Sequence, residues 1–299
     1  MRARLVALIG LVLASSAALS EQVTLKGADA FAVMRKMTCG TVEVGVPRYG
    51  IFEGRVYSRV PGEKDRHLFN LLGINTRQCA SVADKQRGAG FRSVSREIMM
   101  YLDKDTGEPV DEWANPFTGE TVEVVHVAND PVNMRAPRYE KDENGKRGSV
   151  TVRRYGPLTA SSSEVPLFYV NPLGGEFQDY VGGRYHAMEI FNTFYPTDEL
   201  LNSEYASLSQ SNIAWVRVAQ WLPWMTMGDK PGIMIFNATG FSTFEQSLIP
   251  DNLMEILESR YPEYLTPPPL ADDRVNETSW TVFRDHVGEQ RASDDAGHD

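Results

Sequence analysis

The residues best suited to chemistry occupy alternate positions of two segments, 185–195 and 213–221. Both segments have the patterning of strands, in which successive side chains point to opposite faces. Tyr185 and Glu189 therefore share one face of the first strand. Arg217 lies on a face of the second strand that is opposite a row of valines. Two faces of such different character predict a barrel, with one face lining a cavity and the other packed under helices or loops.

If these faces point inward, Arg217 and Glu189 share a cavity with Tyr185, Trp215 and Trp221. Arginine offers a planar fork for a carboxylate, and aromatic residues offer ring faces. Burial raises the pKa of a glutamate towards neutral, which suits an acid or base. The group predicts binding of an aromatic acid, with Arg217 holding its carboxylate, Glu189 moving a proton and Tyr185 orienting a phenol or oxyanion. The alternative is a buried Arg–Glu pair that satisfies itself.

Further residues are candidates for substrate binding. The full set is Trp215, Trp221, Trp224, Tyr195 and His126. The segment WLPWMTMG at 221–228 is either a lid over the cavity or a packed corner at the end of the barrel. The histidines lack the HxH or HExxH spacing of a metal site, and no Walker loop, GxGxxG or GxSxG motif occurs. We therefore expect neither a metal nor another cofactor.

Most of the chain has β patterns separated by turn residues, which favours antiparallel neighbours. The expected strands are 42–46, 55–60, 67–75, 93–102, 121–127, 165–170, 185–195, 213–221 and 233–239. Helices are expected at 28–37, 250–263 and 278–287. So many strands must protect their edges. The predicted fold is therefore mainly β, an antiparallel calycin-like β-barrel with peripheral N- and C-terminal helices.

The first twenty residues are typical of a secretory signal. Arg2 and Arg4 precede an apolar run at 5–14, and small residues follow. The run is too short to cross a bilayer, so we expect export to the periplasm or beyond without membrane insertion after cleavage. The alternative is an apolar N-terminal helix of a cytosolic domain. The formal net charge of −10 disfavours nucleic acid and anionic lipid as partners.

The expected organisation has four parts. They are a signal peptide at 1–20, one β-rich barrel domain at 21–265, a Pro-rich link with a C-terminal helix at 266–292, and a disordered tail at 293–299. Cys39 and Cys79 are the two cysteines of the chain. In an oxidising compartment they could close a disulfide, and the alternative is two buried thiols too far apart to join.

Three stretches resemble one known family. They are YLDKDTGEPV at 101–110, WANPFTGETVEVVHVANDPV at 113–132 and WLPWMTMG at 221–228. The chain resembles the family catalogued as domain of unknown function 1838, over about residues 28–267. The resemblance brings no reaction and no catalytic residues.

Two classes of function fit these observations. The first is a cofactor-independent enzyme, such as a decarboxylase, lyase or isomerase, that acts on a small aromatic or apolar carboxylic acid. The second is a periplasmic binding protein for a hydrophobic small molecule. A third alternative is an envelope protein-interaction module that exposes residues 221–227 as an apolar patch.

Overall fold

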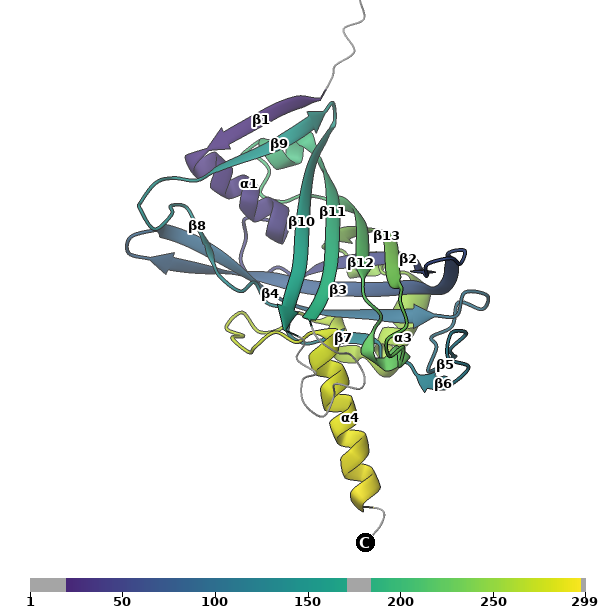
Figure 1. The fold of residues 1–299 in the computed structure, drawn as a ribbon. Helices are drawn as coiled ribbons and strands as arrows, with labels where there is room; N and C mark the ends of the chain where they lie inside the picture. Colours follow the sequence, from purple (N-terminus) through teal and green to yellow (C-terminus); the bar gives the residue numbers. More distant parts are fainter. Residues whose placement is uncertain (1–19, 171–183, 297–299) are drawn as a thin grey trace, which may run out of the picture.

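The computed structural model describes residues 20–170 and 184–296 (Figure 1). The predicted signal peptide lies outside these residues, apart from Ser20. The strands are β1 (Glu21–Lys26), β2 (Arg48–Arg59), β3 (Arg66–Asp84), β4 (Gly88–Leu102), β5 (Glu112–Ala114), β6 (Thr121–Glu123), β7 (Val127–Asn129), β8 (Arg138–Tyr139), β9 (Ser149–Tyr155), β10 (Leu158–Val170), β11 (Arg184–Pro196), β12 (Ser211–Ala219) and β13 (Ile233–Thr243). The α-helices are α1 (Gly27–Cys39), α2 (Thr197–Leu201), α3 (Asp251–Arg260) and α4 (Ser279–Ala296), and the 3₁₀ turns are η2 (Pro223–Met225), η3 (Gln246–Leu248) and η4 (Pro262–Leu265).

One 11-stranded sheet dominates the molecule. Its order is β1-β9-β10-β11-β12-β13-β2-β3-β4-β7, with β8 also paired to β4, and every pairing is antiparallel. The expected mainly antiparallel β class is confirmed. Closure into a barrel by hydrogen bonds is wrong, because the sheet ends at β1 and β7 without pairing them among the residues described. Helix α1 instead spans the open side, packing against β1 and β9 as well as β3 and β4 (Figure 1).

The sheet bends sharply where β13, β2 and β3 meet, so that β10–β12 run across β3 and β4 (Figure 1). Gly54 of β2 and Gly240 of β13 make this bend possible. A Cβ atom on Gly54 would overlap the carbonyl oxygen of Asn237, and one on Gly240 would overlap the carbonyl oxygen of Ile51. Glycine in a strand permits such a close approach of backbones. The bend turns β4 and β11 towards each other, and we call the face between them the inner face.

Both faces of the sheet are covered where they carry apolar residues. On the outer face, Leu253 and Leu257 of α3 pack with Tyr264 of η4 against the outward side chains of β2, β3 and β4. On the inner face, Trp280 of α4 packs against Tyr185 with ring centroids 4.7 Å apart. Helices therefore cover the sheet from both sides.

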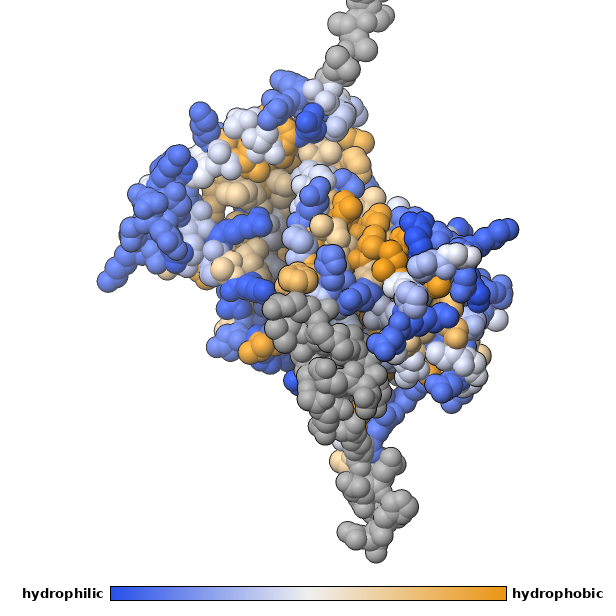
Figure 2. Space-filling model, viewed as in Figure 1, coloured by the Kyte–Doolittle hydropathy of each residue, from blue (hydrophilic) through white to orange (hydrophobic). Residues whose placement is uncertain are grey.

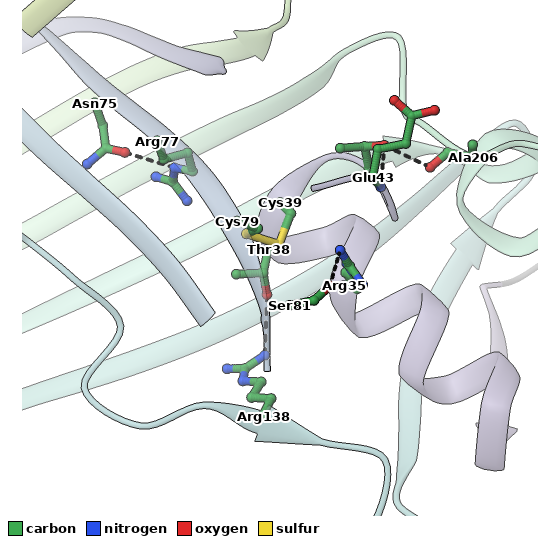
Figure 3. Close-up of a disulfide and its surroundings, with 11 residues drawn as sticks. Arg35, Thr38, Cys39, Glu43, Asn75, Arg77, Cys79, Ser81, Arg138 and Ala206 are labelled. Atoms are coloured by element: carbon green, nitrogen blue, oxygen red, sulfur yellow. Dashed lines mark hydrogen bonds between the residues drawn. A yellow bond between two sulfur atoms is a disulfide. The ribbon is translucent and has the colours of Figure 1, made fainter. Parts of the chain in front are cut away.

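The N-terminal helix is fixed to the sheet by the disulfide between Cys39 and Cys79 (Figure 3). The two Cα atoms are 5.9 Å apart, so the pairing that the sequence left open does form. Lys36, only 2% exposed, donates hydrogen bonds to the carbonyl oxygens of Glu199, Asn202 and Tyr205 at the end of α2. Helix α1 is thus held at its C-terminal end by a covalent bond and a buried cation.

Four predictions about individual segments need correction. Residues 42–46 form a loop. The N–H of Val42 donates to the carbonyl of Ala206 and the N–H of Gly45 donates to the carbonyl of Cys79, so the segment does not pair with a single neighbouring strand. The expected strand at 121–127 is divided into β6 and β7, since Val124 N–H donates to Asp111. The expected helix at 250–263 ends at Arg260, before Pro262, whose ring cannot continue it. Helix α4 continues to Ala296, into the segment expected to begin a tail at Ser293.

Candidate functional site

The structure brings Glu189 and Arg217 together on the inner face, as strand alternation predicts. They are direct cross-strand partners of β11 and β12, and Arg217 Nη1 lies 3.2 Å from Glu189 Oε1. Arg217 Nη2 donates a hydrogen bond to Tyr185 Oη. The side chains of Arg217 and Glu189 retain 17% and 18% exposure. We call these three residues the Arg217 cluster.

Both terminal nitrogens of Arg217 are already engaged by this arrangement. Burial would lower the pKa of the guanidinium, but Tyr185 and Glu189 outweigh burial and raise it above its ordinary value. Arg217 is therefore a fixed positive charge whose fork is directed at residues of its own protein. Its Nε is buried and has no hydrogen-bond partner among the described residues.

Aromatic rings continue the inner face beside this cluster. Trp215 packs with Phe52, Phe191 and Phe236, at ring-centroid distances of 6.4, 6.4 and 5.9 Å. The indole Nε1 of Trp215 is buried without a hydrogen-bond partner in the described part of the chain. This wall offers an apolar surface and one unsatisfied donor to a bound molecule.

The segment at 221–228 packs as a corner. Trp224 is 4% exposed and lies against Phe69, Tyr101 and Trp113. Trp221 packs on Phe117, and its Nε1 donates to the carbonyl of Lys230 at 3.0 Å. In Figure 2 the exposed apolar side chains gather over β12 and β13. The corner alternative therefore fits the burial of this segment.

Two of the expected binding residues lie apart from the Arg217 cluster. Tyr195 is six residues beyond Glu189 on β11, about 20 Å along the strand, and it packs with Leu200 and Leu208. The imidazole Nδ1 of His126 accepts a hydrogen bond from the backbone N–H of Tyr101 at 3.2 Å. Burial lowers the pKa of His126 to about 4. The strand expected at 121–127 is interrupted at this point. The side chain of His126 therefore takes the place of a strand carbonyl as acceptor for the N–H of Tyr101 in β4.

A second polar group on the inner face was not predicted from the sequence. Asn75 of β3 is the register partner of Glu97 of β4, and its Nδ2 donates to Glu97 Oε2 at 3.3 Å. Arg77 Nε donates to Asn75 Oδ1 at 2.8 Å (Figure 3). We call these three residues the Arg77 cluster. The available signal was the presence of polar residues at alternate positions of two strands, N-x-R at 75–77 and S-x-S-x-E at 93–97.

The Arg77 cluster differs electrostatically from the Arg217 cluster. No carboxylate among the described residues forms an ion pair with Arg77 within 4.0 Å, and burial lowers its pKa. Burial and the charge of Glu189 raise the pKa of Glu97, although Asn75, Arg77 and Arg217 act in the opposite direction. Both clusters lie on the inner face, and the charges of Glu189 and Arg217 act on the pKa of Glu97.

The inner face is positively charged in a negatively charged protein. On β2–β4 and β10–β13, the charged side chains described on this face are three arginines and two glutamates. They are Arg48, Arg77, Arg217, Glu97 and Glu189. Burial and the charge of Arg77, the register partner of Arg48, lower the pKa of Arg48 to about 10. Such a surface favours an anionic molecule.

Neither a metal cluster nor a membrane-spanning helix is found in the described part of the chain. No group of three or more His, Cys, Asp or Glu residues there could hold a metal ion. None of the helices at 20–170 and 184–296 combines the length and apolar character needed to cross a membrane.

Comparison with known proteins yields one match. No curated protein and no solved structure matches the chain. A family model matches residues 47–287, which include the bent sheet apart from β1, both polar clusters and the first half of α4. The chain therefore belongs to the family described as "protein of unknown function (DUF1838)".

Proposed function

We propose that this protein is an exported, cofactor-independent enzyme that acts on a small aromatic or apolar carboxylic acid. The observation that carries the proposal is the inner face itself, where charged and aromatic side chains stand together and the central ion pair stays partly exposed. A sheet face used only for packing would be apolar, because buried charges cost free energy unless they are paired. The reaction class is a decarboxylation, lyase or isomerase reaction that moves a proton.

Export is the second part of the proposal. The disulfide supports it, because such bonds persist in oxidising compartments and are rare in the cytosol. The signal-like N-terminal sequence supports it independently.

The test is to incubate the mature protein with a panel of aromatic carboxylic acids and follow each acid by mass spectrometry. The proposal expects consumption of at least one acid. Glu189→Gln should slow this turnover about tenfold or more, because the residue proposed to move the proton is lost. Glu164→Gln is the matched control, since Glu164 lies on β10 in the neighbouring register position and is exposed. Turnover of no acid by the wild-type protein would contradict an enzymatic function.

One observation favours the binding-protein alternative. Arg217 and Glu189 engage each other directly, so neither needs a substrate to be satisfied. A carrier would bind an acid from the same panel in equilibrium dialysis and release it unchanged. The interaction-module alternative has less support, because Trp221, Trp224 and Met227 are all buried.

A further inference from the structure

Two of the three arginines on the inner face, Arg77 and Arg217, differ in their capacity to bind a ligand, and this difference locates the anion-binding end of the site. Arg217 has both terminal nitrogens engaged by Glu189 and Tyr185. Arg77 uses its Nε on Asn75 and has no carboxylate partner in the described part of the chain. No described residue accepts a hydrogen bond from the Nη atoms of Arg77, and neither atom is among the buried polar atoms without a partner. A planar fork that is fixed at Nε and open at Nη is the geometry that receives a carboxylate.

The orientation of Arg77 is set by its neighbours. Asn75 accepts a hydrogen bond from Arg77 and donates one to Glu97, so one amide aligns both charged groups. Cys79, which forms the disulfide with Cys39, lies two residues after Arg77 on the same face of β3. Arg77 is therefore held on a rigid part of the sheet, which reduces the entropy that a ligand would have to remove.

Glu97 lies near Arg77, with Asn75 hydrogen-bonded to both side chains. The groups that face Glu97 are Asn75 and Arg77 of β3, Glu189 of β11 and Arg217 of β12. Asn129 of β7 is its register partner on the other side. A protonated Glu97 can donate a hydrogen bond to a ligand carboxylate, whereas an ionised Glu97 repels it.

We propose that Arg77 and the protonated form of Glu97, both positioned by Asn75, bind the carboxylate of the ligand. This assignment rests on the proposed function, since it presumes that a carboxylic acid occupies the inner face, and it moves the anion-binding role from Arg217 to Arg77. Asn75 is a positioning residue. Arg217 keeps Glu189 and Tyr185 in place.

The sign of the pH dependence follows from Glu97. Burial and the charge of Glu189 raise its pKa, so Glu97 is protonated to a higher pH than an ordinary glutamate. A bound carboxylate raises that pKa further. By linkage, ligand affinity should decrease as pH rises through the pKa of Glu97.

The test is isothermal titration calorimetry of the full mature chain with benzoate and phenylacetate at pH 5 and pH 8. Benzamide and phenylacetamide are the uncharged control ligands. We expect the wild-type protein to bind a carboxylate in preference to its amide and to bind it more tightly at pH 5. Arg77→Met should weaken carboxylate binding on the order of 10- to 100-fold, the usual effect of losing charge-assisted hydrogen bonds. Glu97→Gln should remove most of the pH dependence.

Two matched variants complete the experiment. Arg55→Met changes an exposed arginine on the outer face of β2 and should leave affinity unchanged. Arg77→Lys keeps the charge but not the fork, and it provides the comparison if Arg77→Met does not fold. Equal affinity of wild-type protein and both Arg77 variants would overturn the assignment of Arg77 while leaving the proposed function in place. Failure of the wild-type protein to bind either carboxylate would overturn both.

Discussion

The two polar clusters of the inner face contain the same kinds of charged residue but differ in what their arginines contact. In the Arg217 cluster, the arginine is paired with a glutamate and a tyrosine of the neighbouring strand. In the Arg77 cluster, an asparagine stands between arginine and glutamate, so the charges do not neutralise each other directly. A pair that satisfies itself contributes to stability, whereas a separated pair leaves binding capacity for a ligand. Under the proposed function, the two arginines therefore differ in whether their terminal nitrogens are engaged, and not in their position on the inner face.

The largest expected effect concerns the helix that covers the open side of the sheet. Replacing Cys39 and Cys79 by alanine should lower the free energy of unfolding by about 4 kcal/mol in the chain-entropy model for a loop of 40 residues. Urea denaturation of variant and wild type, with and without reductant, measures this. A variant as stable as the oxidised wild-type protein would show that α1 is held by packing alone.

Removing the cation of the Arg217 cluster should come next in size. Arg217→Met leaves Glu189 without its partner in a mostly buried position and should cost about 3 kcal/mol of stability. Adding Glu189→Gln should restore most of that loss, because no unpaired charge then remains. The exposed Arg55→Met is the control, expected to change stability by about 0.5 kcal/mol or less. An Arg217 variant no less stable than this control would break the distinction between the clusters.

A buried titratable group outside both clusters gives a reference for pH effects. His126 has its pKa lowered to about 4, below the ordinary 6.5, so the unfolded chain binds a proton that the folded protein resists. Its contribution to stability is complete above pH 6.5 and is lost as pH falls towards 4, by up to about 3 kcal/mol. His126→Gln should flatten the dependence of unfolding free energy on pH over this range. The same slope in both proteins would mean that other groups produce it.

The smallest stability effect is expected in the Arg77 cluster. Arg77→Met should change the free energy of unfolding by less than about 1 kcal/mol, because Arg77 has no carboxylate partner to leave behind and its own burial is unfavourable. Thermal and urea denaturation at neutral pH measure the difference from wild type. A loss as large as that of Arg217→Met would assign Arg77 a structural role.

The sequence predicts the Arg217 cluster because that cluster depends on local alternation. Adjacent strands with Glu189 and Arg217 on corresponding faces are enough to place the two side chains together. The Arg77 cluster required two further facts that no local pattern contains, namely the register of β3 against β4 and the bend that turns β4 towards β11. Adjacent polar residues also concealed it, since Thr76 and Arg96 lie beside Asn75 and Glu97 and obscure the alternation.

The fold shows a similar division. Strands with continuous apolar runs, such as those around 93–102 and 233–239, are where they were expected. Strands β1 and β9 were missed, because polar residues such as Thr24, Arg153 and Arg154 weaken their pattern. Barrel closure was predicted from the need to protect edges, but helices contact the two edge strands instead, α1 at β1 and α4 at β7.

The most direct test of the central claim is a crystal structure of the mature protein with benzoate or phenylacetate bound. We predict the ligand carboxylate within hydrogen-bond distance of the Arg77 Nη atoms and of Glu97, with the Arg217–Glu189 ion pair intact. A carboxylate bound to Arg217, with Glu189 displaced, would contradict this account.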